Sequence, residues 1–293
     1  MVLAGTVLAA AAQEAFKTAD QAADALARAA RSGDRNAVLT ILGKDAADIV
    51  SSGDPVADSA TRQAFLAAYD ERHHIDTESD NKAVMIVGHD DFPFPIPIVR
   101  NGEGWRFDTA AGRLEILYRR IGRNEIDAIQ ACLAYVDAQN DYADKDHGAG
   151  RGAYAQHIVS QPGTQDGLYW PAKTGEEESP LGALVAVATA EGYKVGGARA
   201  PFHGYYYKIL TRQGSNAPGG ALDYVVNGKM IGGFALVAYP AEYGNSGVMT
   251  FLVNHAGAVF QKDLGPDTAR IAERITSFNP DQTWKVIDIA SMQ

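Results

Sequence analysis

The chain has 293 residues, 26 basic and 36 acidic side chains, a formal net charge of −10 and 46% hydrophobic residues. This composition excludes wholesale disorder, a collagen-like repeat and a multi-span membrane protein. The length predicts two domains, and the acidic balance excludes nucleic acid as a partner because phosphates are repelled. The single cysteine, Cys132, excludes an intramolecular disulfide and a cysteine-built zinc site. It lies in an apolar helical pattern, so we expect it to be a buried small hydrophobic side chain.

Residues 1–12 are uncharged and mostly apolar, but they are too few to span a bilayer, which needs roughly 20 residues. Ala10 and Ala12, followed by Gln13-Glu14, resemble the cleavage site of a secretory signal peptide without its basic leader. The alternative is a plain apolar helix start. We expect cleavage near Ala12 and a periplasmic or secreted protein with no transmembrane span.

Helical patterns fill the chain up to about residue 70. Thr18 and Gln21 form a capping box, and apolar residues at helical spacing follow them. Asp34 is predicted to cap a second helix and Ser59 a third, in which Tyr69 belongs to the buried stripe.

Short strands are predicted next. Residues 83–88 form a β-branched run. Residues 92–99 carry three prolines at alternate positions, which predicts an edge strand, because the missing N–H groups then share one edge. The turn at residues 101–104 leads back into residues 105–108, which predicts a hairpin.

One long helix is predicted from Gly112 to about Asp144, where apolar residues recur at helical spacing without proline; at 1.5 Å per residue it spans roughly 45 Å. An antiparallel meander and a final helix from Asp267 to Phe278 are predicted after it. The strand runs of the meander are 205–209, 224–226, 233–239, 248–253 and 258–260. The predicted fold class is α+β: an N-terminal α+β domain, a long connecting helix, and an antiparallel meander packed on that helix.

Two parts of the chain resemble known folds. The Ala30-Arg-Ser-Gly-Asp34 break and the Asn101-Gly-Glu-Gly-Trp-Arg-Phe-Asp108 hairpin resemble the cone-shaped domains of the nuclear-transport-factor-two-like superfamily. Residues 124–142, 204–210 and 251–259 resemble the globular part of type IV pilins and pseudopilins, where a helix lies against a meander. The domains implied are 13–112 (cone-like) and 113–293 (pilin-like), after a signal-peptide segment at 1–12.

The chain departs from pilins where they carry a hydrophobic half-helix that assembles the fibre. Arginines occupy that place, and a whole domain precedes them. The arginines are Arg113, Arg119, Arg120 and Arg123. The resemblance therefore does not imply a pilin-type fibre.

Longer motifs cover the full length: Ser51-Ser-Gly-Asp-Pro-Val56, Asp91-Phe-Pro-Phe-Pro-Ile-Pro97, Gly167-Leu-Tyr-Trp-Pro171 and Asn227-Gly-Lys-Met-Ile-Gly-Gly-Phe-Ala-Leu-Val237. With these motifs the chain resembles the bacterial exported family called domain of unknown function 2950. The resemblance implies export and no particular activity.

A candidate binding strip follows Pro201. His203, Tyr205 and Tyr207 alternate along a predicted strand, so we expect them on one face. A ring-lined groove there suits a sugar, a peptide or a partner strand. The alternative is that these rings pack against the long helix.

Two polar segments of the first domain are candidates for a cone pocket. Asp70, His73 and His74 end the third helix, and a His89-Asp90-Asp91 turn follows the first strand. A His/Asp pair inside an apolar cone would support proton transfer. The alternative is solvated turn residues, with Asp90 and Asp91 retained as candidate binding residues.

Asp144 and Asp146 are spaced as in calcium loops. Ala149 and Ala155 stand where an EF-hand needs Gly and Glu, so a helix-ending turn is the alternative. We expect no cofactor and no catalytic residue, since nucleophile-elbow, Walker and His-Glu-x-x-His motifs are missing.

The sequence thus predicts an exported, non-catalytic binding or assembly protein whose partner is an envelope protein or a small ligand. The alternative is a small-molecule hydrolase or isomerase that uses a His/Asp pair in the cone pocket. The ligand and the oligomeric state stay open.

Overall fold

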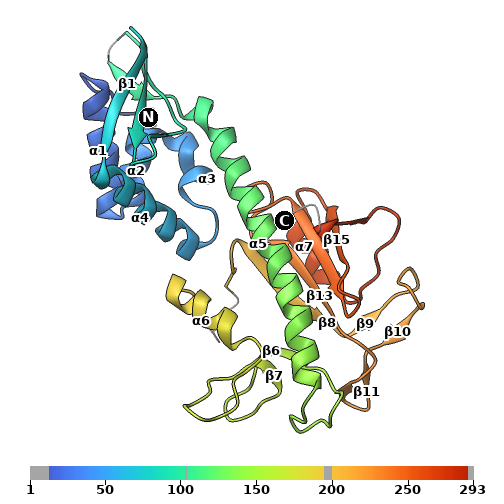
Figure 1. Cartoon of the computed structure of the whole chain (residues 1–293). Helices are drawn as coiled ribbons and strands as arrows, with labels where there is room; N and C mark the ends of the chain where they lie inside the picture. The colour runs from blue at the N-terminus through green and yellow to red at the C-terminus, as the bar shows by residue number, and fades with distance from the viewer. Residues whose placement is uncertain (1–12, 103, 195–199, 290–293) are drawn as a thin grey trace, which may run out of the picture. The chain divides into compact units, whose positions relative to one another are not determined.

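Figure 1 shows the computed structural model, which describes residues 13–102, 104–194 and 200–289. The fold class is α+β, as predicted, with antiparallel sheets and one long helix. The described chain divides into two compact units. The first unit holds residues 13–52 and 58–118, and the second holds residues 53–57 and 119–289. The expected signal-peptide segment, residues 1–12, lies outside the described residues.

Five helices precede the sheet of the first unit in the described chain, and α1 and α2 start as predicted. The five are α1 (Ala19–Ser32), α2 (Arg35–Leu42), the 3-10 helix η1 (Lys44–Ala46), α3 (Ala47–Val50) and α4 (Pro55–Glu71). The Thr18 hydroxyl accepts from the Gln21 N–H at 3.2 Å, and the Asp34 carboxylate accepts from the Asn36 N–H at 2.8 Å. Both caps are confirmed, because capping is decided within one helical turn.

The prediction that Ser59 caps the third long helix is wrong. Helix α4 begins five residues earlier than a Ser59 cap implies, at Pro55, where proline is tolerated because a first-turn N–H has no helical partner. Asp54 caps it instead: one carboxylate oxygen accepts from the N–H groups of Val56 and Ala57, at 3.1 and 3.2 Å.

The first unit's sheet has the order β1-β2-β4-β5, with β3 also paired to β2, and every pairing is antiparallel. Its strands are β1 (His73–Ser79), β2 (Lys82–Val87), β3 (Phe92–Pro93), β4 (Ile98–Arg100) and β5 (Trp105–Phe107). The predicted hairpin is confirmed by the antiparallel pairing of β4 with β5 and by the Asn101 N–H, which donates to the Gly104 carbonyl at 3.0 Å; Glu103 lies outside the described residues.

The single edge strand predicted for residues 92–99 is wrong. The segment forms two short strands that pair with opposite ends of β2, and β4 also pairs with β5. Pro95 and Pro97 have no N–H to donate, so the ladder is interrupted where they stand. The Phe94 N–H still donates to the Met85 carbonyl at 2.7 Å.

Helix α5 (Thr109–Ala143) is the predicted long helix, with 35 residues and a length of roughly 50 Å at 1.5 Å per residue. Its residues up to Tyr118 belong to the first unit and the rest to the second. In the second unit it packs on the sheet: Cys132 is fully buried in the core, and the Tyr135 ring meets the Phe234 ring edge-on at 5.6 Å. The predicted helix-on-meander packing is therefore present.

The main sheet of the second unit is an antiparallel meander in the order β16-β15-β14-β13-β8. Its strands are β8 (Tyr205–Leu210), β13 (Ala235–Pro240), β14 (Met249–Asn254), β15 (Val259–Asp263) and β16 (Lys285–Val286). Strand β13 is buried along its whole length.

Residues 224–226 are not part of this sheet, contrary to the prediction. Strand β10 (Leu222–Asp223) pairs with β9 (Arg212–Gln213), and β11 (Val225–Val226) pairs with β12 (Lys229–Met230). Asn227 and Gly228 both have positive φ, 50° and 77°, which is the geometry of a two-residue hairpin turn. This turn folds the segment back on itself.

Helix α7 (Thr268–Arg274) is shorter than the predicted helix from Asp267 to Phe278. Asp267 occupies the N-cap position, but its carboxylate pairs with Arg270 at 2.8 Å rather than with the backbone. Ile275 is extended, and the buried Phe278 donates its N–H to the Arg212 carbonyl. Burial of Phe278 beside β9 therefore ends the helix early.

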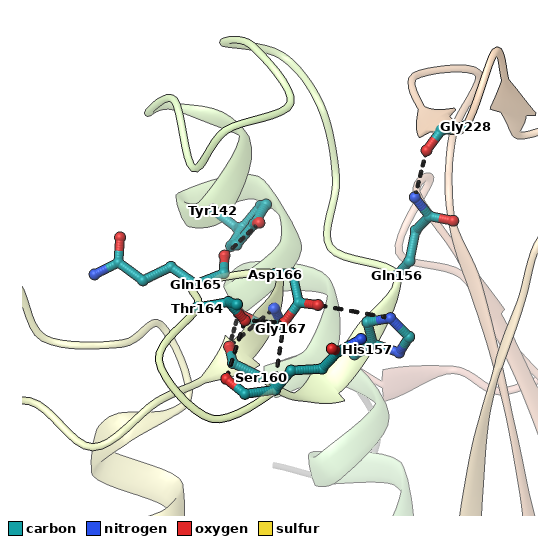
Figure 2. Close-up of polar contacts among 10 residues, drawn as sticks. Tyr142, Gln156, His157, Ser160, Thr164, Gln165, Asp166, Gly167 and Gly228 are labelled. Carbon is teal, nitrogen blue, oxygen red and sulfur yellow. Dashed lines mark hydrogen bonds and ion pairs between the residues drawn. The ribbon is translucent and has the colours of Figure 1, made fainter.

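A compact loop joins β6 (His157–Val159) to β7 (Gly167–Tyr169), two parallel strands of the second unit. Figure 2 shows its polar contacts: Asp166 accepts from the Thr164 hydroxyl at 2.7 Å, and Ser160 accepts from the Gly167 N–H at 2.9 Å. The Tyr142 hydroxyl donates to the Gln165 carbonyl at 2.7 Å, which ties the loop to the end of α5.

Helix α6 (Gly182–Glu191) is the remaining helix described in the second unit. None of the helices in the described ranges is both long enough and apolar enough to cross a bilayer.

Candidate functional site

A cavity of about 420 Å³ lies in the second unit, partly open to solvent. Helix α5 and helix α6 contribute to its walls, with β6, β8 and β13, and we call it the α5–α6 pocket. The described residues that line it are Ala131, Tyr135, Ile158, Val159, Leu181, Leu184, Val185, Ala188, Tyr193, Lys194, Ala200, Pro201, Phe202, Tyr206, Tyr207 and Leu236. The lining is almost entirely aliphatic and aromatic.

Helix α6 supplies the aliphatic wall. Leu184, Val185 and Ala188 face the pocket from one side of the helix, as residues at i, i+1 and i+4 do. The other side is apolar as well: Val187 is 56% exposed. The helix ends at Gly192, whose φ of 104° requires glycine and whose N–H closes the last turn.

Most hydroxyl groups of the pocket tyrosines have protein partners. Tyr193 donates to an Asp54 carboxylate oxygen at 2.9 Å, and Tyr135 contacts the Ala235 carbonyl at 3.3 Å. Burial and the neighbouring Asp54 charge raise the pKa of Tyr193 above its usual value. Burial also raises the pKa of Tyr207 well above its usual value. These tyrosines therefore stay neutral at physiological pH.

His203 lies beside the pocket, between two carboxylates. Its Nδ1 is 3.0 Å from Asp127 of α5, and its Nε2 is 3.0 Å from Glu191 at the end of α6. The hydrogen bond to Asp127 raises the pKa of His203, against the opposing effect of burial, and the Glu191 charge adds to the rise. The rings of Tyr193 and Phe202, which line the pocket, contact the imidazole. His203 thus joins Asp127 of α5 to Glu191 of α6 next to the cavity.

Asp54 is a buried carboxylate on the same side of the pocket, with 1% of its surface exposed. One oxygen caps α4, and the other accepts from the Tyr193 hydroxyl and from the Gly204 N–H, at 2.9 and 3.0 Å. Gly204 has a φ of 75°, and a Cβ there would lie 2.5 Å from the Asn124 amide nitrogen. Asp54 therefore fixes the position of Tyr193 in the pocket wall.

We expect the stability of the second unit to fall as the pH rises through the folded-state pKa of His203. The folded-state pKa of His203 is raised above the unfolded value of 6.5. The stability that its pairing with the two carboxylates contributes is therefore fully present below about pH 6.5, and it is lost as the pH rises through the folded-state pKa. Urea unfolding from pH 5 to 9 measures it. The His203→Gln variant should lose this pH dependence. The control is His157→Gln, which replaces an exposed histidine 3.9 Å from Asp166 and should keep the pH dependence. Equal pH profiles for the wild type and His203→Gln would contradict the role assigned to His203.

Two residues of the predicted binding strip, Tyr205 and Tyr207, belong to strand β8, and the third, His203, lies before it. Tyr207 lines the pocket, and His203 lies next to it with a φ of 49°, before β8 begins. Tyr205 is fully buried instead: its ring packs on Phe251 and its hydroxyl donates to the Met249 carbonyl at 2.9 Å. The expected alternation holds for Tyr205 and Tyr207, which are two positions apart in β8. It does not include His203, because the left-handed backbone there precedes the strand.

The structure does not bring the candidate residues of the first unit together, and each described contact joins a different pair. Asp91 pairs with Arg72 at 3.0 Å, His89 with Glu71 at 3.2 Å, and Asp90 is exposed. His74 is 3.4 Å from Asp76 on the exposed strand β1. His73 stacks on Tyr69 and contacts the Tyr69 carbonyl at 2.8 Å.

Aromatic rings pack together in the first unit. The Phe65 ring lies 5.4 Å from Phe94, and Phe94 lies 6.2 Å from the buried Phe107. Phe107 belongs to the buried interior of this unit together with aliphatic residues such as Met85, Ile96 and Ile98, whereas none of the three candidate histidines is buried.

The Asp144–Asp146 segment is a hydrogen-bonded turn. One Asp146 oxygen accepts from the N–H groups of Gly148 and Gly150, both at 2.8 Å, and Asp144 is exposed. The Gly150 and Gly148 N–H groups lower the pKa of Asp146. In the described ranges, no group of three or more His, Cys, Asp or Glu side chains is arranged to hold a metal ion.

Four residues of the site were not predicted from the sequence: Asp54, Asp127, Glu191 and Tyr193. Residues 182–190 are apolar nearly throughout, so no amphipathic periodicity marks the face of α6 that lines a cavity. The Asp54-Pro55 pair is the one local signal, and it points to a helix start rather than to a pocket.

A family model described as Protein of unknown function (DUF2950) matches residues 13–287. No curated protein matches the chain significantly, and no solved structure does.

Proposed function

We propose that this chain, which belongs to the DUF2950 family, is a non-catalytic protein that binds an apolar or amphipathic small molecule in the α5–α6 pocket. The observation that carries the proposal is the pocket itself. Its volume of about 420 Å³ falls in the ~300–1,000 Å³ range of small-molecule sites. Its lining of leucine, valine, alanine and aromatic side chains favours an apolar chain or ring.

The polar groups around the pocket favour binding over catalysis. A general base needs a ring nitrogen or carboxylate that is free to reach a substrate proton. Both nitrogens of His203 are paired with carboxylates, and the Tyr193 hydroxyl is held by Asp54. These groups hold α5, α6 and the pocket wall in place.

Export to the periplasm or cell exterior is part of the proposal. Its support is the signal-peptide pattern at residues 1–12 together with the resemblance to an exported family. The cone-like and pilin-like character of the two domains also stays a prediction. In this account the protein carries its ligand in the cell envelope, and an envelope protein partner is the other candidate.

Filling the pocket is expected to abolish binding. Ala188 lines the pocket on α6 and is 7% exposed, whereas Ala190, two residues later, is exposed and does not line it. The probe is N-phenyl-1-naphthylamine, an uncharged fluorophore that brightens in apolar sites. The Ala188→Trp variant should bind it at least about tenfold more weakly, since a tenfold loss needs only ~1.4 kcal/mol.

The Ala190→Trp variant is the matched control and should bind like the wild type. Thermal unfolding of both variants confirms that they are folded. Binding by folded Ala188→Trp with wild-type affinity would refute the proposed site.

A further inference from the structure

We infer that the ligand is a single-chain amphiphile with an anionic head group, such as a fatty carboxylate, and that Lys194 binds this head group at the edge of the α5–α6 pocket. The inference rests on the proposed function and specifies its ligand class. It depends on where the charges around the pocket lie and on which of them already have partners.

Lys194 carries the one charged side chain among the described lining residues. It is exposed and lines the pocket, and a lysine in such a place can keep its ammonium group in water while its stem covers apolar surface. Across the described ranges, no carboxylate forms an ion pair with it. The pocket therefore offers an available positive charge beside an apolar chain site.

The nearest acidic residue in the sequence does not neutralise Lys194. Glu191, three positions earlier, is bound to His203 at 3.0 Å, and Asp127 holds the other nitrogen of the same ring. The two carboxylates thus contact the His203 ring rather than the lysine. A ligand carboxylate would supply the counter-ion that the described residues do not, through a charge-assisted hydrogen bond.

Tyr207 offers a second donor. Its hydroxyl lies 3.5 Å from the Phe202 carbonyl, a distance beyond that of a normal hydrogen bond. The hydroxyls of Tyr193 and Tyr135 already contact an acceptor at 2.9 and 3.3 Å. The Tyr207 hydroxyl is therefore the one best placed to exchange its weak contact for a ligand oxygen.

The test compares three ligands with the same decyl chain: decanoate, decanol and decyltrimethylammonium. Isothermal titration of the full chain, below the micelle concentrations, measures their affinities. We expect decanoate to bind about threefold to tenfold more tightly than decanol, the range of an exposed ion pair with a charged hydrogen bond. The cationic ligand should bind most weakly.

The Lys194→Gln variant should bind decanoate and decanol equally, with decanol affinity unchanged, and Lys194→Glu should prefer the cationic ligand. The matched control is Lys285→Gln on strand β16, which should keep the wild-type order. Raising the salt concentration should reduce the decanoate preference, because exposed charges are screened.

Equal affinities for decanoate and decanol in the wild type would overturn the head-group inference and leave the proposed pocket standing. A decanoate preference that survives in Lys194→Gln would overturn the role of Lys194. If none of the three ligands binds and N-phenyl-1-naphthylamine does not bind either, the proposed function itself fails.

Discussion

The Asp54→Ala variant is expected to lose about 3–5 kcal/mol of the second unit's free energy of unfolding, since it removes a helix cap and hydrogen bonds to a buried charge. The Asp54 carboxylate is 1% exposed and accepts from the N–H groups of Val56, Ala57 and Gly204 and from the Tyr193 hydroxyl. Alanine would leave these donors without their acceptor.

Urea unfolding of the full chain measures the loss. The chain has three tryptophans, and replacing Trp105 with phenylalanine leaves Trp170 and Trp284, both in the second unit, as its fluorescence probes. Tyr193→Phe removes two hydrogen bonds, the one donated to Asp54 and the one accepted from the His203 N–H at 3.2 Å, and should cost about 2–3 kcal/mol. Asp137→Ala, at an exposed position of α5, should change stability by less than ~0.5 kcal/mol. If Asp54→Ala were as stable as Asp137→Ala, the structural role of Asp54 would be wrong.

The second large effect is expected at Gly112, in the first turns of α5. A Cβ there would lie 2.5 Å from the Pro95 carbonyl oxygen and 2.8 Å from the Ile96 Cα. Both are backbone atoms that cannot move aside alone, so Gly112→Ala should destabilise the first unit by about 2–3 kcal/mol, the cost of overpacking. Urea unfolding followed through Trp105 measures it.

Gly122 provides the control on the same helix. A Cβ at Gly122 would meet nothing within 4 Å, so Gly122→Ala should stabilise the chain by about 0.5–1 kcal/mol through helix propensity. Opposite signs of the stability change in Gly112→Ala and Gly122→Ala would distinguish the effect of close packing from that of helix propensity. Two stabilising substitutions would show that α5 does not approach residues 95–96 closely.

Much of the fold follows from local signals. The caps at Thr18 and Asp34, the long helix α5 and the meander strands each depend on residues close together in the sequence. Cys132 is buried as expected, which raises its pKa to about 12. The errors occurred where tertiary contacts decide: Phe278 leaves the helix to fill the core, and residues 224–226 pair within their own hairpin.

The site was harder to predict because its parts are distant in the sequence. Asp54 meets Tyr193 and Gly204 across 139 and 150 positions, and no periodicity reports such a contact. The positive φ at His203 has no sequence signature either, because histidine, unlike glycine, does not mark that conformation. The prediction that His203 and Tyr207 belong to a binding region stays a prediction, and the structure adds a cavity beside them.

The central claim is that the α5–α6 pocket holds an apolar chain. The most direct test is the measurement of nuclear Overhauser effects between bound decanoate and the labelled methyl groups of the full-length protein. The account predicts contacts from the chain methylenes to Leu184 and Val185 of α6 and to Leu236 of β13. Contacts confined to exposed methyl groups elsewhere, such as Val226 and Ile231, would contradict it.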